Sequence, residues 1–184
     1  QPDFPDLPDH EYFVNEVPEA LQDNFSPAAY LGYHLDTFTS NMIISNPSGV
    51  NETFGITCAH EGYPGHMFQS VYTRSVCEHQ YLYIADSVGY AEGWATYVEN
   101  YSFKYFCEND NAQILLTIDN EFPLMLYARV DIGINYEGWT SDDVMNYFSG
   151  LGMSPSQDGI EEMCQLFTNQ PGYGIKYGVG FLNT

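Results

Sequence analysis

Apolar residues recur three or four positions apart through part of the chain's second half, which is the spacing of one helix face. This pattern predicts a helix at 114–126, disturbed at Pro123 because proline has no backbone N–H to donate. Further helices are predicted at 86–107, 141–149 and 156–168, each starting at or beside a residue that can cap a helix. The second half is therefore expected to be helical.

The first part of the chain carries a different pattern. Aromatic and β-branched residues at 28–46, interrupted by polar ones, predict a β-hairpin, and a helix is predicted to follow from Asn51. Residues 1–27, which open on a proline-spaced acidic stretch, are expected to form an extended arm or linker. The expected fold is mainly α with a small β-hairpin or sheet, in a single domain over 1–184 whose helical core spans 50–184.

Acidic residues dominate the charged positions. The 184 residues include 25 Asp and Glu but only 4 Lys and Arg, which gives a formal net charge of −21. Such a field repels phosphates and excludes nucleic acid as a partner. It is more typical of a solvated acidic surface than of a means of attracting cationic peptides.

The chain carries no pattern of a membrane span or an export signal. No apolar stretch approaches the ~20 residues of a transmembrane helix, and residues 1–6 lack the basic and apolar regions of a signal peptide. Any export signal is expected outside this chain.

The four cysteines show no C-x-x-C spacing, and Cys58 is expected in the core. Their even number is compatible with one or two disulfides in an extracellular protein, and equally with reduced, buried thiols.

Two histidines and a glutamate suit a metal site. His60 is followed directly by Glu61, then by Pro64 and His66, and Glu92 stands further along. Imidazole and carboxylate groups are zinc ligands, and Glu61 stands where the general base for a metal-bound water is expected. The His-Glu pair alone favours a simpler interpretation, a helix ending at Pro64 with two polar histidines at a surface turn. Adding Glu92 favours the metal site.

The spacing of the two histidines requires an irregular backbone. Six residues of regular helix turn by about 600°, so His60 and His66 would point roughly 120° apart. Pro64 removes a backbone donor and Gly65 accepts unusual dihedral angles, so both favour a distortion at this point. The sequence therefore predicts that the helix carrying His60 is broken between Gly62 and His66.

These residues resemble a bacterial family known as domain of unknown function 885. Its signature His-Glu-x-x-Pro-Gly-His-x-x-Gln is complete at 60–69, and a second block, Tyr-x-Glu-Gly-Trp-Ala-x-Tyr-x-Glu, is matched at 90–99. Two further stretches, 131–139 and 171–180, are similar to the family. The resemblance implies a zincin-like metallopeptidase that binds one zinc ion, with Glu61 as general base and the ligands His60, His66 and Glu92.

The chain also differs from the family pattern. Met67 and Asn135 stand where histidines are common in the family, and Tyr173 stands in place of a glutamine. Substrate contacts at 135 and 173 therefore do not carry over. Family proteins are longer, with a large helical region before the part seen here. The resemblance thus implies the C-terminal catalytic portion of a longer protein, expected outside the cell or at its surface as a secreted protein or lipoprotein.

Two further residues are candidates for the site. Tyr177, in the matching tail, is expected either to donate its hydroxyl to an oxyanion or, with equal weight, to pack in the core; Tyr173 is the fallback donor. Glu99 lies seven positions after Glu92 and so shares its helix face. It could hold a ligand histidine, but a solvated carboxylate is the favoured interpretation.

Three functions remain open. The leading hypothesis is zinc-dependent hydrolysis of a peptide substrate by a metal-activated water. The alternatives are a metal- or peptide-binding module without turnover, and a hydrolase of other acyl substrates such as esters or cell-wall amides.

Overall fold

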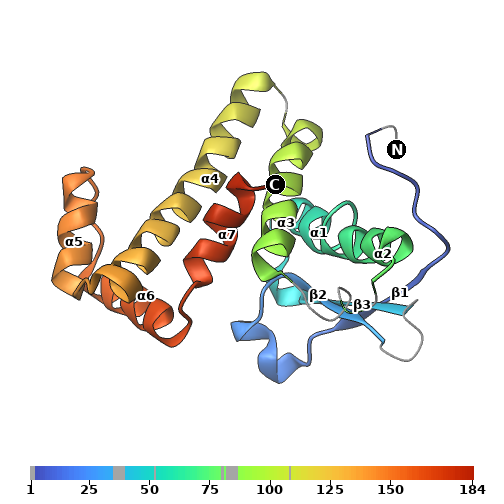
Figure 1. Ribbon diagram of the computed structural model, residues 1–184, viewed down its shortest axis with the longest axis horizontal. Coiled ribbons are helices and arrows are strands. Elements are labelled where there is room, and N and C mark those ends of the chain that lie inside the picture. The colour runs from blue at the N-terminus through green and yellow to red at the C-terminus, as the bar shows by residue number, and fades with distance from the viewer. Residues whose placement is uncertain (1–2, 35–39, 52, 80, 82–86, 108) are drawn as a thin grey trace.

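The computed structural model is mainly helical, with a small sheet at one end (Figure 1). It describes residues 3–34, 40–51, 53–79, 81, 87–107 and 109–184. The strands are β1 (Glu11–Glu16), β2 (Ala28–Tyr33) and β3 (Ser40–Ser45). The α-helices are α1 (Phe54–Glu61), α2 (His66–Val76), α3 (Val88–Phe106), α4 (Asp110–Ile132), α5 (Ser141–Gly150), α6 (Gln157–Asn169) and α7 (Tyr173–Leu182).

The sheet confirms the predicted hairpin and adds a strand to it. β2 and β3 pair antiparallel, and β1 pairs with the other edge of β3 in parallel, from Glu11 beside Ser40 to Glu16 beside Ser45. The expectation that residues 1–27 form only an arm or linker is therefore wrong. All six residues of β1 are exposed, and its apolar residues, Tyr12 to Val14, stand in one run, so the strand lacks the alternation of a half-buried strand.

The same first segment also contributes to the core. Phe4 is buried, and its ring packs edge-on against the rings of Phe68 in α2 and Trp94 in α3. A short 3₁₀ helix, Glu19–Asn24, follows β1. Aromatic pairs of this geometry contribute beyond the area they bury. The start of the described chain is thus fixed to the helices that carry the candidate site.

The later helices confirm the predicted ones, with one difference in length. In α5 the side chain of Thr140 accepts from the backbone of Asp143, and in α6 Ser156 accepts from Gly159. α4 runs from Asp110 to Ile132, however, and continues through Pro123 without ending there. A proline removes only one hydrogen bond from a helix of this length, so the expected disturbance does not break α4.

Helix α7 was not predicted, and it lies between α3 and α4 (Figure 1). Its glycines give the segment a low helix propensity, because glycine disfavours a helix interior, so the sequence did not indicate a helix here. They also allow its close packing. A Cβ atom on Gly93 of α3 would lie 2.3 Å from the backbone of Gly180, so the two helices touch through bare backbone.

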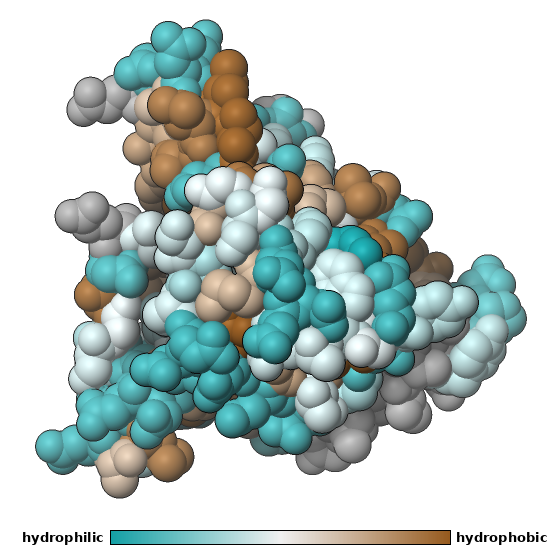
Figure 2. All heavy atoms as spheres, turned by 90° about the vertical axis from the view of Figure 1, so that its left-hand side faces the viewer, coloured by the Kyte–Doolittle hydropathy of each residue, from teal (hydrophilic) through white to brown (hydrophobic). Residues whose placement is uncertain are grey.

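Apolar side chains form a core at one end and an uncovered surface at the other. The core joins α4, α5 and α6 through Leu126, Val130, Val144, Phe148, Ile160 and Phe167. In the first half of α4, by contrast, several apolar residues are each 40–67% exposed. They are Ile114, Leu115, Leu116, Ile118 and Phe122. Apolar side chains gather at the top of the space-filling view, where α4 begins (Figure 2). None of the described helices is both long and apolar enough to cross a membrane.

The buried carboxylate of Asp131 holds α7 against the end of α4. One oxygen accepts from Asn135 Nδ2 at 2.8 Å and from the backbone N–H of Gly172 at 3.1 Å. The other accepts from the N–H of Gly174 at 2.8 Å. These backbone donors lie at the start of α7, where helix N–H groups lack partners within the helix and where a negative charge is favourable.

We therefore expect Asp131→Ala to lower the free energy of unfolding by roughly 2–4 kcal/mol, since buried backbone donors would lose a charged acceptor. Chemical denaturation followed by circular dichroism would measure this. Glu162→Ala, which removes an exposed carboxylate of α6, is the control and should change stability by no more than about 0.5 kcal/mol. Equal effects of the two substitutions would contradict the anchoring role of Asp131.

Candidate metal centre

The predicted break between the two histidines is confirmed. α1 ends at Glu61, α2 begins at His66, and the connection contains a cis peptide bond between Tyr63 and Pro64. A Cβ atom on Gly65 would lie 1.8 Å from the carbonyl oxygen of His60, so only glycine allows α2 to begin so close to the end of α1. The two imidazole rings consequently lie close together, edge to face, with centroids 4.6 Å apart.

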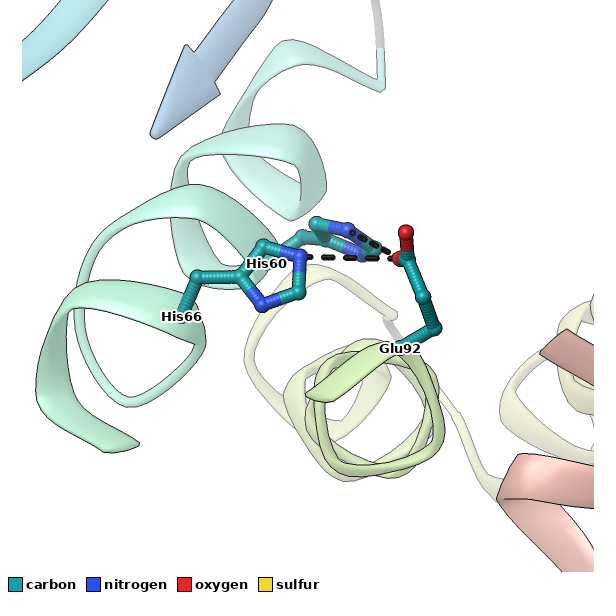
Figure 3. Close-up of side chains that lie close together, drawn as sticks. All are labelled: His60, His66 and Glu92. Atoms are coloured by element: carbon teal, nitrogen blue, oxygen red, sulfur yellow. Dashed lines mark ion pairs between the residues drawn. The ribbon is translucent and has the colours of Figure 1, made fainter. Parts of the chain in front are cut away.

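Glu92 projects from α3 toward both histidines (Figure 3). Its Oε2 atom lies 3.8 Å from His60 Nε2 and 3.6 Å from His66 Nε2, too far for a hydrogen bond. This oxygen is buried and has no hydrogen-bond partner. A buried acceptor of this kind costs free energy unless something binds it.

The three side chains fit a metal ion. Each offers one ligand atom, and these atoms lie within 4.8 Å of one another. Ligands about 2.0–2.1 Å from a tetrahedral ion lie roughly 3.3 Å apart, close to the separations of Glu92 Oε2 from the two imidazoles. The structure thus brings His60, His66 and Glu92 together as a group that could hold a metal ion.

The other oxygen of Glu92 is paired with Lys176 of α7. Lys176 Nζ donates to Glu92 Oε1 at 3.0 Å. Burial alone would raise the pKa of Glu92, but the contacts with His66 and Lys176 lower it to about 2. The sequence did not reveal this pair, because α7 was not predicted and the two residues are 84 positions apart.

Glu99 holds His60 from the side opposite Glu92. His60 Nδ1 and Glu99 Oε1 are 2.8 Å apart, and Glu99 Oε2 accepts from Asn120 of α4 at 2.8 Å. The favoured interpretation of Glu99 as a solvated carboxylate is therefore wrong. Burial disfavours the charged imidazole, but the bond to Glu99 and the surrounding carboxylates raise the pKa of His60 overall. A carboxylate on Nδ1 leaves Nε2 as the nitrogen that faces Glu92.

Glu61 lies at the edge of the same group. Its Oε1 atom is 3.8 Å from His60 Nε2, and its Oε2 accepts from the backbone N–H of Tyr30 at 2.7 Å. Tyr30 belongs to the edge strand β2, so the small sheet orients this carboxylate. Its side chain remains 16% exposed, which leaves room for water to approach.

Tyr177 lies beside Glu92, in a half-buried position on α7. Burial raises the pKa of its hydroxyl, and the nearby charge of Glu92 raises it further. The ring of Tyr173 packs against it with centroids 5.6 Å apart. The structure thus places Tyr177 near Glu92, and its role as an oxyanion donor stays a prediction.

A cavity of about 430 Å³ adjoins this region between α3 and α7. Tyr90 and Lys176 are among its lining residues, together with Ile175 and Val179. Lys176 thus lies between the cavity and Glu92.

Cys58, two residues before His60, is exposed on α1, so its expected place in the core is wrong. On this helix Ala59 faces inward instead. Cys58, Cys107 and Cys164 are free thiols, which favours the reduced alternative over two disulfides.

Comparison with known proteins gives a family match and a structural match. A family model described as a bacterial protein of unknown function, DUF885, matches residues 1–184. A crystal structure described as that of "the putative lipoprotein from Colwellia psychrerythraea" superposes with a TM-score of 0.70 at 23% identity. The match covers 96% of this chain but 31% of that one, so the chain spans about a third of its length. No curated protein matches.

Proposed function

This chain belongs to the bacterial family of unknown function DUF885, and we propose that it is a zinc-dependent hydrolase, specifically a metallopeptidase. The observation that carries the proposal is the buried Oε2 atom of Glu92, which faces His60 Nε2 and His66 Nε2 without a hydrogen-bond partner. Glu61 lies at the edge of this group, 3.8 Å from His60 Nε2, which supports a role as general base.

The ligand set favours zinc over the other common divalent ions. Two imidazole nitrogens and one carboxylate suit zinc, whereas magnesium and calcium prefer all-oxygen ligands. His60, His66 and Glu92 would hold the ion. When bound there, zinc supplies a Lewis acid that activates a water molecule at neutral pH and polarises a carbonyl group.

The remaining steps fall to side chains of this chain. Glu61 accepts the proton of the attacking water and later delivers it to the leaving nitrogen. The backbone N–H of Tyr30 keeps the Glu61 carboxylate oriented through that exchange. The Tyr177 hydroxyl donates to the substrate oxygen as negative charge develops on it, which is the charge that a preorganised donor stabilises best.

The wider proposal is a zincin-like catalytic portion of a longer protein. The break between α1 and α2 accommodates the unusual histidine spacing, and the long solved neighbour supports a larger parent chain with further regions. The neighbour's description also supports a location at the cell surface or outside the cell. The alternatives are a binding module without turnover, which would hold zinc but cleave no peptide mixture, and a hydrolase of esters or cell-wall amides, which product analysis would reveal.

We expect one zinc ion per chain in protein purified without chelators. His60→Ala, His66→Ala and Glu92→Ala should each lose it, because two remaining ligands bind zinc far less tightly. Elemental analysis by mass spectrometry measures the content, and His79→Ala, outside the group, is the control. Full zinc content in Glu92→Ala would remove this residue from the ligand set.

The substitution Glu61→Gln tests whether Glu61 acts as the general base and not as a metal ligand. The amide keeps the shape of the carboxylate but cannot accept the proton, so we expect wild-type zinc content and a loss of hydrolysis by about a hundredfold or more. Cleavage of a peptide library, followed by mass spectrometry, measures the activity. Wild-type turnover in this variant would refute the role of Glu61.

Tyr177→Phe should lower turnover by about 10²–10³-fold, which corresponds to ~2.7–4 kcal/mol for the loss of one oxyanion donor. Zinc content and thermal stability should stay close to wild type. Tyr173→Phe, which removes the neighbouring hydroxyl, is the matched control with a smaller expected effect. If Tyr177→Phe turns over normally, its hydroxyl has no part in the chemistry.

A further inference from the structure

Lys176, one of the four lysines and arginines of this acidic chain, contacts the candidate metal ligand Glu92. Lys104 pairs with Asp3 and Arg129 with Glu137, neither of them a candidate ligand, and Arg74 donates to Ser70 and Asn41. In a chain with a formal net charge of −21, a cation at this place is a specific feature.

The position of Lys176 is defined by its surroundings. Its ammonium lies 4.7 Å from the centroid of the Tyr173 ring and 4.6 Å from that of Tyr177, within cation–π range of both. Its side chain is 25% exposed. Asp131 fixes the first turn of α7 through two backbone N–H groups, so the helix that carries Lys176 is anchored at its start.

The two oxygens of Glu92 have different environments. Lys176 Nζ binds Oε1 at 3.0 Å, and Oε2 faces the two imidazole nitrogens. A free carboxylate can rotate and present either oxygen, or both, to a metal ion. A donor fixed on Oε1 removes that freedom and leaves Oε2 as the ligand atom.

We propose that Lys176 is a positioning residue, which holds Glu92 as a ligand through one oxygen. Its ammonium fixes Oε1 so that Oε2 points between His60 and His66. This inference rests on the metal site of the proposed function, but it does not require that the bound metal hydrolyses anything.

The direction in which zinc affinity changes when Lys176 is removed separates a positioning role from the effect of a neighbouring charge. An ammonium close to a metal cation repels it, so if charge alone mattered, removal of Lys176 would tighten zinc binding. If Lys176 positions Glu92, its removal weakens zinc binding. Partners that orient metal ligands typically contribute ~10–100-fold to metal affinity.

The test measures the zinc dissociation constant by competition with a chromophoric chelator. Lys176→Met keeps the length of the side chain and removes the donor, and we expect zinc binding at least about tenfold weaker than wild type. Lys176→Arg, which retains a donor for Oε1, should lie closer to wild type. Lys104→Met, at the pair with Asp3, is the control and should bind zinc as wild type does. Thermal unfolding of the metal-free proteins checks that all variants fold.

A double-mutant cycle then shows whether Lys176 acts through Glu92. In a Glu92→Ala background, measured by calorimetry at the higher zinc concentrations this variant needs, Lys176→Met should cause no further weakening. Unchanged or tighter zinc binding in Lys176→Met alone, or the same weakening in both backgrounds, would overturn the proposal.

The outcomes also distinguish this inference from the proposed function. Zinc binding that depends on Lys176, with no cleavage of any peptide or ester, would retain the positioning role and reject the hydrolase. Peptide cleavage with zinc affinity independent of Lys176 would retain the hydrolase and reject the positioning role. Wild-type protein that binds no zinc would reject both.

Discussion

The close approach of Gly65 to the end of α1 is the constraint on which the candidate site depends. A side chain there would meet the carbonyl oxygen of His60 at 1.8 Å and push α2 away, carrying His66 with it. The indole of Trp94 in α3 donates to the carbonyl oxygen of Pro64 at 2.9 Å, which ties the same connection to the helix that bears Glu92. One short irregular segment therefore sets the relative positions of all three candidate ligands.

Each carboxylate around this segment is held by a donor from a different part of the fold. A strand N–H, that of Tyr30, binds Glu61; the side chain of Asn120 binds Glu99; and Lys176 binds Glu92. Partly buried charges need such partners, because a carboxylate loses its water on burial. The sheet, α4 and α7 thus have a common role, which is to fix acidic side chains that would otherwise rotate.

The sequence was sufficient for the candidate ligands and for most helices, but not for these supports. His60 and His66 lie within one short motif, and the break between them follows from Pro64 and Gly65. By contrast, the pairing of Lys176 with Glu92 needs α7, whose glycines suppress its helix propensity while permitting contact with α3. The bond from Tyr30 is made by the backbone, so no side chain in the sequence could indicate it. Exposed β1 was missed because strand pairing with β3, rather than burial, defines it.

The charges of the site provide a separate argument for the class of ion. Among the described residues at this point, the carboxylates of Glu61, Glu92 and Glu99 face one ammonium, that of Lys176, and two imidazoles. With neutral imidazoles, two negative charges remain unbalanced in a partly buried space. The raised pKa of His60 expresses this same excess, since the carboxylates favour a proton on the ring. A divalent cation would neutralise both charges and would bind the oxygen of Glu92 that has no partner, whereas a monovalent ion would leave one charge uncompensated.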